Sequence, residues 1–264
     1  MFLDAHTHTQ FAAFKEDYKD VIGRALVSDV ALINVGTQKD TSRRAVEVAH
    51  EFEDKPVYAA VGLHPIHLKA GLVKLDHEEV QFETIEESFD REKYKALALS
   101  SKKVVAIGEI GLDYYWKTDR DKQRTVFLEQ LNLARDLKLP VILHCRSAHD
   151  EMLDILDGSF RGVVHCFTGD WEQAQRYLAM GLYLGFNGII FKMNLDEVIR
   201  RTPSEMMLLE TDCPYLTPPQ ESGRNEPLYI KYVAQKIAEV KGMDYSAITD
   251  ITTNNAKNLF NINL

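Results

Sequence analysis

Cysteine is scarce in this sequence, with 3 residues among 264. A small and odd number of cysteines in a long chain argues against a disulfide framework and is typical of a reducing compartment. Apolar runs are short as well, and none approaches the roughly 18 residues that a membrane-spanning helix needs. The first ten residues, MFLDAHTHTQ, lack the basic and apolar regions of a secretory signal peptide. We therefore expect a cytoplasmic protein that does not associate with membranes.

Basic residues are also too few to balance the acidic ones, since 31 lysines and arginines face 40 aspartates and glutamates, a net charge of −9. A protein that holds nucleic acid through a broad electrostatic surface needs clustered lysine and arginine. The acidic balance argues against that class, and any chemistry on nucleic acid must be local to one site. The apolar share of 45% and the charged share of 27% are those of an ordinary globular protein.

Short apolar runs alternate with amphipathic segments along the whole chain. Eight of these runs read as strands: Phe2–Ala5, Ala31–Val35, Val57–Val61, Val104–Ile107, Val141–Leu143, Gly162–Val164, Leu182–Gly185 and Met206–Leu209. Continuous apolar runs are typical of strands that are buried on both faces. Eight strand–helix repeats in 264 residues predict a (β/α)8 TIM barrel that forms a single domain over residues 1–264. The alternative is an open doubly wound sheet, but its glycine-rich phosphate-binding turn is absent after the first strand.

Two stretches interrupt the alternation. Residues 76–95 carry eight acidic side chains, and we expect an acidic, solvated excursion over about residues 68–95 that ends in a helix at Arg91–Leu99. Residues 213–227 hold four of the eight prolines and predict a long rigid loop after the eighth strand. Loops that follow the strands of a barrel build its active site, so this loop is expected to border it.

Histidines and acidic residues collect at the carboxyl ends of the predicted strands, where barrels place their active sites. They are His6, His8, His64, Glu109, His144, His165 and Asp212. Alternate side chains of a strand point the same way, so His6 and His8 can bind one metal ion. Without His64, the set still offers four imidazoles and two carboxylates, which is more than one catalytic zinc takes. Such a set suits two divalent ions that share a carboxylate, and it does not choose among Mg, Mn and Zn.

Seven motifs in this sequence resemble the signature set of the TatD-like metal-dependent deoxyribonucleases, a family of hydrolases. They are DAHTH (4–8), GLHP (62–65), GEIGLDYY (108–115), HCRSAHDE (144–151), HCFTG (165–169), ETDCPYL (210–216) and RNEP (224–227). The resemblance implies a (β/α)8 fold, a divalent-metal site and the 3′-to-5′ exonuclease activity of characterised members. It further implies that one metal is held by His6, His8, Glu109 and Asp212, and the other by Glu109, His144 and His165. Glu109 would then bridge the two ions.

These observations together predict a divalent-metal-dependent phosphodiester hydrolase that acts on DNA ends through a metal-activated water. We expect Asp212 to accept the proton of that water and His64 to be a second catalytic group. We also expect His64, Arg224 and Arg146 to contact phosphate oxygens, since a guanidinium can grip phosphate with two donors. No membrane and no obligate protein partner is expected.

Two alternatives remain open at this point. The same metals could hydrolyse another ester or an amide, such as an aminoacyl ester on tRNA. A non-enzymatic, metal-dependent binding module is the alternative from another class, and the complete ligand set argues against it. Cys145, Cys166 and Cys213 each follow a candidate ligand directly, so we expect them to turn away from the site and to be structural.

Overall fold

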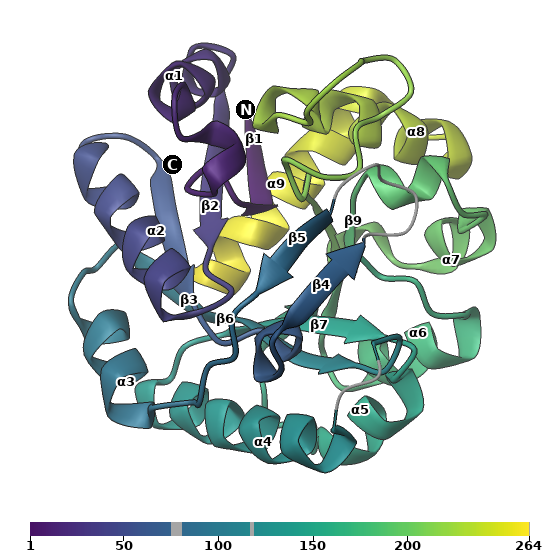
Figure 1. Ribbon diagram of the computed structural model, residues 1–264. Helices are drawn as coiled ribbons and strands as arrows, with labels where there is room; N and C mark the ends of the chain where they lie inside the picture. Colours follow the sequence, from purple (N-terminus) through teal and green to yellow (C-terminus); the bar gives the residue numbers. More distant parts are fainter. Residues whose placement is uncertain (75–80, 117–118, 264) are drawn as a thin grey trace.

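The computed structural model describes residues 1–74, 81–116 and 119–263. Eight parallel strands form a nearly closed barrel with helices packed around it (Figure 1), so the (β/α)8 prediction is confirmed. In pairing order the strands are β1 (Phe2–Thr7), β2 (Val30–Val35), β3 (Val57–Val61), β6 (Val104–Asp113), β7 (Val141–Arg146), β8 (Gly162–Val164), β9 (Tyr183–Phe186) and β10 (Met207–Leu209). The α-helices are α1 (Tyr18–Val27), α2 (Lys39–Glu51), α3 (Arg91–Leu99), α4 (Arg120–Leu137), α5 (His149–Ile155), α6 (Trp171–Ala179), α7 (Asp196–Arg201), α8 (Ile230–Lys241) and α9 (Tyr245–Phe260).

The barrel strands are buried on both faces, as their continuous apolar character predicts. All six residues of β2 and all ten of β6 are buried. One apolar cluster joins early strand residues, among them Leu3 and Val105, to Leu259 and Phe260 at the end of α9. Apolar side chains therefore fill the end of the barrel at which the strands begin, and the polar residues gather at the other end. Among the described residues, no helix combines the length and apolar character that crossing a membrane requires.

The seam between β1 and β10 is closed by hydrogen bonds just beyond β10. Buried Asp4 accepts hydrogen bonds from the backbone N–H of Thr211 at 2.9 Å and from its hydroxyl at 2.6 Å. The backbone N–H of Asp212 donates to the carbonyl of His6, and that of His8 donates to the carbonyl of Cys213, both at 2.9 Å. These bonds hold Asp212 beside the two histidines of the first strand.

The helix predicted to end the acidic stretch is confirmed, since α3 spans Arg91–Leu99, but the predicted ends of two barrel strands are wrong. The fifth strand was expected to end at Leu143, but β7 continues to Arg146. The fourth barrel strand was expected to end at Ile107, before Glu109, but β6 continues to Asp113 because its second half pairs with β7 up to Arg146. Glu109 therefore lies within the strand. The acidic excursion contains an antiparallel hairpin of β4 (Gly71–Lys74) and β5 (Gln81–Thr84) (Figure 1). Residues 75–80 of that stretch lie outside the described residues.

Candidate metal centre

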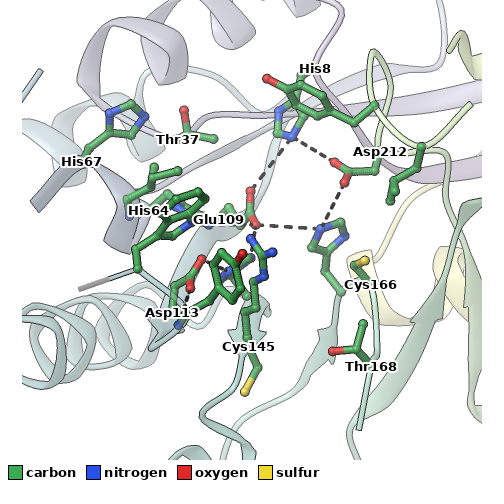
Figure 2. A pocket seen from close by; sticks show the side chains of 18 of the residues that line it. His8, Thr37, His64, His67, Glu109, Asp113, Cys145, Cys166, Thr168 and Asp212 are labelled. Carbon is green, nitrogen blue, oxygen red and sulfur yellow. Dashed lines mark hydrogen bonds and ion pairs between the residues drawn. The ribbon is translucent and has the colours of Figure 1, made fainter. Parts of the chain in front are cut away.

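The carboxyl ends of the strands surround a cavity of about 1450 Å³. The predicted site residues that line it are His8, His64, Glu109, His144, Arg146, His165, Asp212 and Arg224. His6 is fully buried and lies directly beside this set. Figure 2 shows His8, Glu109 and Asp212 turned toward one another in the cavity. The structure thus brings together residues that are up to about 200 positions apart in the sequence.

Glu109 lies at the centre of the site, and its two carboxylate oxygens face different histidines. Oε2 lies 3.4 Å from Nε2 of His6 and 4.0 Å from Nε2 of His8. Oε1 lies 2.9 Å from Nδ1 of His144 and 3.8 Å from Nε2 of His165. Burial alone would raise the pKa of Glu109, but the surrounding histidines lower it well below its usual range. An ionised carboxylate with one oxygen toward each group is suited to bridge two cations.

Asp212 completes the side of the site that His6 and His8 form. Its Oδ1 lies 3.3 Å from Nε2 of His8, and its Oδ2 lies 3.8 Å from Nε2 of His165. Burial raises the pKa of this carboxyl, but the charge of His165 and the contact with His8 outweigh burial and lower it. Asp212 is therefore ionised at neutral pH, and 15% of its side chain remains accessible from the cavity.

The chemistry of these donors fits a divalent cation. Nδ1 of His8 lies 2.7 Å from the carbonyl of Val35 and must carry a hydrogen there, so in the neutral ring Nε2 keeps its lone pair. That Nε2 lies 3.1 Å from Nε2 of His6. Three groups have ligand atoms within 4.8 Å of one another: His6, His165 and Asp212; His6, His8 and Glu109; and His64, Glu109 and His144. Imidazole nitrogens mixed with carboxylate oxygens suit Zn and Mn, and carboxylates suit Mg.

His64 differs from the other histidines in its hydrogen bonding. Its Nδ1 accepts a hydrogen bond from the backbone N–H of Ile66 at 3.0 Å. Burial and the neighbouring His144 lower the pKa of His64, so the ring is neutral and its hydrogen sits on Nε2. This Nε2–H points at Oε1 of Glu109 at a distance of 3.4 Å. In this tautomer His64 is a hydrogen-bond donor and not a metal ligand.

Two carboxylates that contact candidate metal ligands were not predicted from the sequence. Oδ2 of Asp113 lies 3.1 Å from Nε2 of His144, and Oε1 of Glu210 lies 2.8 Å from Nδ1 of His165. Asp113 is four residues beyond Glu109 in β6, and Glu210 is two residues before Asp212. Strand alternation does not identify either one, because β6 is irregular between Ile107 and Ile110 and Asp212 has a left-handed φ of 58°.

The two predicted phosphate-binding arginines are already engaged by protein groups. The guanidinium of Arg146 lies 3.8 Å from the ring centre of Tyr115. That of Arg224 forms a two-pronged ion pair with Asp17, at 3.0 Å to Oδ1 and 2.7 Å to Oδ2, and covers the ring of Phe14. Arg224 thereby joins the loop after β10 to the segment before α1. Contact of either arginine with phosphate stays a prediction.

Cys145 and Cys166 line the cavity (Figure 2), so the prediction that all three cysteines turn away from the site is not confirmed for these two. Cys213 is fully buried, and Cys145 packs with its Sγ 3.8 Å from the hydroxyl of Tyr177 on α6. Burial raises the pKa of Cys145 to about 12 and that of Cys166 well above its usual value, so these thiols stay protonated at neutral pH. A protonated thiol is a poor nucleophile and a poor metal ligand.

Comparisons with known proteins agree with this geometry. The family described as TatD related DNase matches residues 3–261. The chain is 40% identical to the "uncharacterized metal-dependent hydrolase YabD" of Bacillus subtilis strain 168, over 100% of both chains. It is 34% identical to the "3'-5' ssDNA/RNA exonuclease TatD" of Escherichia coli K12, over 97% of this chain and 96% of that protein. The solved structure of YjjV, a TatD homologue from Escherichia coli K12, is 31% identical with a TM-score of 0.84, over 99% of this chain and 98% of that chain.

Proposed function

We propose that this chain, a metal-dependent hydrolase that belongs to the TatD-related DNase family, hydrolyses phosphodiester bonds at the 3′ ends of DNA. The observation that carries the proposal is Glu109, whose two oxygens face separate groups of histidines. Two cations on opposite sides of a carboxylate suit the in-line displacement of phosphoryl transfer. The exonuclease names of relatives at 34% identity support this choice, whereas the relative at 40% is named only as a metal-dependent hydrolase.

We assign the ligands of two divalent ions (Mg, Mn or Zn) from the positions of these side chains. His6, His8, Asp212 and Glu109 would hold one ion, and Glu109, His144 and His165 the other. His6 and His8 face one oxygen of Glu109 with Asp212 beside His8, and His144 and His165 face the other oxygen. When bound, the ions supply positive charge toward the phosphoryl oxygens and make water more acidic.

The chain's own groups then have distinct tasks. The ionised carboxylate of Asp212 is partly accessible from the cavity and would accept a proton from the attacking water. The Nε2–H of His64 would donate a hydrogen bond to a phosphate oxygen, as its tautomer allows. Arg146 and Arg224, which line the same cavity, would contact phosphates of the substrate.

A cleavage assay tests the proposal. Chelated protein is supplied with Mg²⁺, Mn²⁺ or Zn²⁺ and incubated with a 5′-labelled single-stranded oligonucleotide, and a small acyl ester is assayed alongside it. We expect the label on progressively shorter products, and no cleavage in the presence of chelator. His6→Ala and His165→Ala should each reduce the rate below about a tenth of wild type, because each removes a donor from a different metal.

Metal titration of Glu109→Gln gives a second readout of the same centre. A neutral amide offsets less of the repulsion between two cations, so both ions should bind more weakly. Wild-type affinity at one of the sites would show that Glu109 does not bridge. Faster hydrolysis of the acyl ester than of the oligonucleotide would favour the ester-hydrolase alternative instead.

A further inference from the structure

A pair of aromatic residues lies on the wall of the cavity directly after β6. Tyr115 and Trp116 both line the cavity, and Tyr115 is 45% exposed. Aromatic rings on a cavity wall are a feature that the proposed phosphodiester chemistry does not itself require. They offer flat apolar surface to whatever part of the substrate lies beside the scissile bond.

The Tyr115 ring is held in place although nearly half of it is exposed. The guanidinium of Arg146 lies 3.8 Å from its centre, and the Trp116 ring packs edge-on at 5.0 Å with an interplanar angle of 88°. A ring fixed on two sides before binding loses little conformational freedom when a ligand stacks on it. The arrangement is therefore a preorganised platform with a cation at its side.

A single carboxylate joins this platform to the candidate metal centre. Oδ1 of Asp113 accepts a hydrogen bond from the backbone N–H of Tyr115 at 3.1 Å, and its Oδ2 lies 3.1 Å from Nε2 of His144. The backbone N–H of Tyr114 donates to the carbonyl of Arg146 at 2.9 Å, which ties the platform to β7 as well. A group that stacks on the platform therefore lies next to a group held at the metals.

We propose that Tyr115, Trp116 and Arg146 form a nucleobase-stacking subsite for a nucleotide adjacent to the scissile phosphate; this inference rests on the proposed function. Every nucleobase has a flat face that stacks on an aromatic ring, and every nucleotide carries a phosphate that a guanidinium binds. Bases inside a duplex are already stacked on one another, so the subsite selects single-stranded ends. The cavity, at about 1450 Å³, exceeds the roughly 300–1,000 Å³ of pockets for drug-sized ligands and suits a polymer.

Tryptophan fluorescence measures the stacking directly. Trp171→Phe leaves Trp116 as the one tryptophan of the chain, since the sequence has two. The metal-loaded protein is titrated with a phosphorothioate-linked oligothymidylate, which resists hydrolysis, and with an abasic oligomer of equal length and linkage. We expect quenching by the oligothymidylate and about tenfold weaker binding of the abasic oligomer, the factor that corresponds to one stacked base.

Variants of Tyr115 locate the effect. Tyr115→Leu should lose about tenfold in affinity for oligothymidylate and little for the abasic oligomer, whereas Tyr115→Phe keeps the ring and should restore the affinity. Tyr245→Leu is the matched control, because Tyr245 is similarly exposed at 40% but lies on α9. Its affinity for both oligomers should equal that of the parent.

The outcomes separate the subsite from the nuclease activity. Cleavage of oligonucleotides with no quenching and equal affinity for the two oligomers would overturn the stacking subsite and leave the nuclease function standing. Quenching and base preference without hydrolysis of any phosphodiester would support the subsite and overturn the proposed function. Loss of base preference in Tyr245→Leu equal to that in Tyr115→Leu would also overturn the subsite.

Discussion

One ring nitrogen of His144 and one of His165 each contact a carboxylate, on the side of the ring away from the proposed metal, whereas His6 and His8 have no such carboxylate partner. Asp113 and Glu210 lie within 3.1 Å of His144 and His165. His8 instead contacts a backbone carbonyl, and Nδ1 of His6 has no hydrogen-bond partner among the described residues. A carboxylate behind a ligand histidine fixes the tautomer and makes the other nitrogen a stronger donor. The two halves of the proposed centre should therefore differ in metal affinity.

Glu210→Gln and Asp113→Asn test this difference. Each change keeps the size of the side chain and removes the negative charge behind one histidine, so we expect about 10–100-fold weaker binding of one metal ion. Calorimetric titration with Mn²⁺ or Zn²⁺ measures the affinities without reference to activity. Glu129→Gln is the control, because Glu129 is exposed on α4. Unchanged affinities in both variants would mean that the two carboxylates only fill space.

At the scale of elements, Asp4 joins the first strand of the barrel to the segment after the last. It accepts hydrogen bonds from the N–H and the hydroxyl of Thr211, and burial raises its pKa well above the usual value. The raised pKa indicates that a charge on Asp4 is unfavourable in this position. Asp4 therefore stabilises the seam by accepting and donating hydrogen bonds. The seam carries Asp212 and the two histidines of DAHTH, so its integrity also controls the geometry of the site.

Asp4→Ala and Asp4→Asn should therefore have different effects. Alanine leaves the buried N–H and hydroxyl of Thr211 without an acceptor, at a cost of roughly 1–3 kcal/mol for each group. Asparagine keeps one acceptor oxygen and can donate to the hydroxyl, so its free energy of unfolding should stay close to that of the parent. Urea denaturation measures both variants. An equal loss in the two would show that the charge of Asp4 is needed.

The proline-rich loop after β10 is joined to the segment before α1 by the Arg224–Asp17 ion pair. Both side chains are partly exposed, at 28% and 37%, and pairs of that kind contribute little to stability. Asp17, together with Glu226 and the carbonyl of Ala13, accepts hydrogen bonds from the guanidinium donors that a phosphate would use. Binding of phosphate by Arg224 would thus compete with Asp17. Substitutions of the two residues can therefore test whether Arg224 contacts phosphate.

Arg224→Ala and Asp17→Asn separate the two roles of the pair. Both remove the Arg224–Asp17 ion pair and should lower the melting temperature slightly. Arg224→Ala should lower it more, because it also removes the contacts of Arg224 with Glu226, the carbonyl of Ala13 and the ring of Phe14. If Arg224 contacts the substrate, only Arg224→Ala should also raise the KM for an oligonucleotide. The KM for a neutral acyl ester should stay unchanged in both variants. Steady-state kinetics on both substrates measure these KM values and show whether Arg224 contacts the substrate. Equal kinetics in the two variants would leave Arg224 with a purely structural role.

For the whole molecule, the sequence was sufficient to predict the architecture and the convergence of the candidate ligands. Buried strands have a recognisable apolar pattern, and the closure of a barrel brings the ends of all of them together. The partners of those ligands could not be predicted, since Asp113 behind His144 and Asp17 on Arg224 depend on the pairing of distant segments. The end of β6 was missed for the same reason, because its pairing with β7 determines it.

Buried neutral histidines make the whole fold sensitive to acid. His67, in the segment after β3, and His149, at the start of α5, are 8% and 7% exposed. Burial lowers the pKa of each to about 4. Between an unfolded pKa of roughly 6.5 and this value, the unfolded chain binds protons that the folded protein does not. Both contributions are therefore fully present above pH 6.5 and are lost as the pH falls through this window.

His149→Phe should flatten that pH dependence. The new ring can pack against Phe167 and Tyr177, which surround His149, and it has no proton to bind. The parent should lose on the order of 3 kcal/mol of stability per histidine between pH 6.5 and 4, and the variant should lose correspondingly less. Urea denaturation across this range, in chelator so that metal release adds nothing, measures the slope. The control is His50→Gln, because His50 is exposed on α2 and meets water whether the chain is folded or unfolded. A slope in His149→Phe equal to that of the parent would show that His149 takes up its proton within the folded protein.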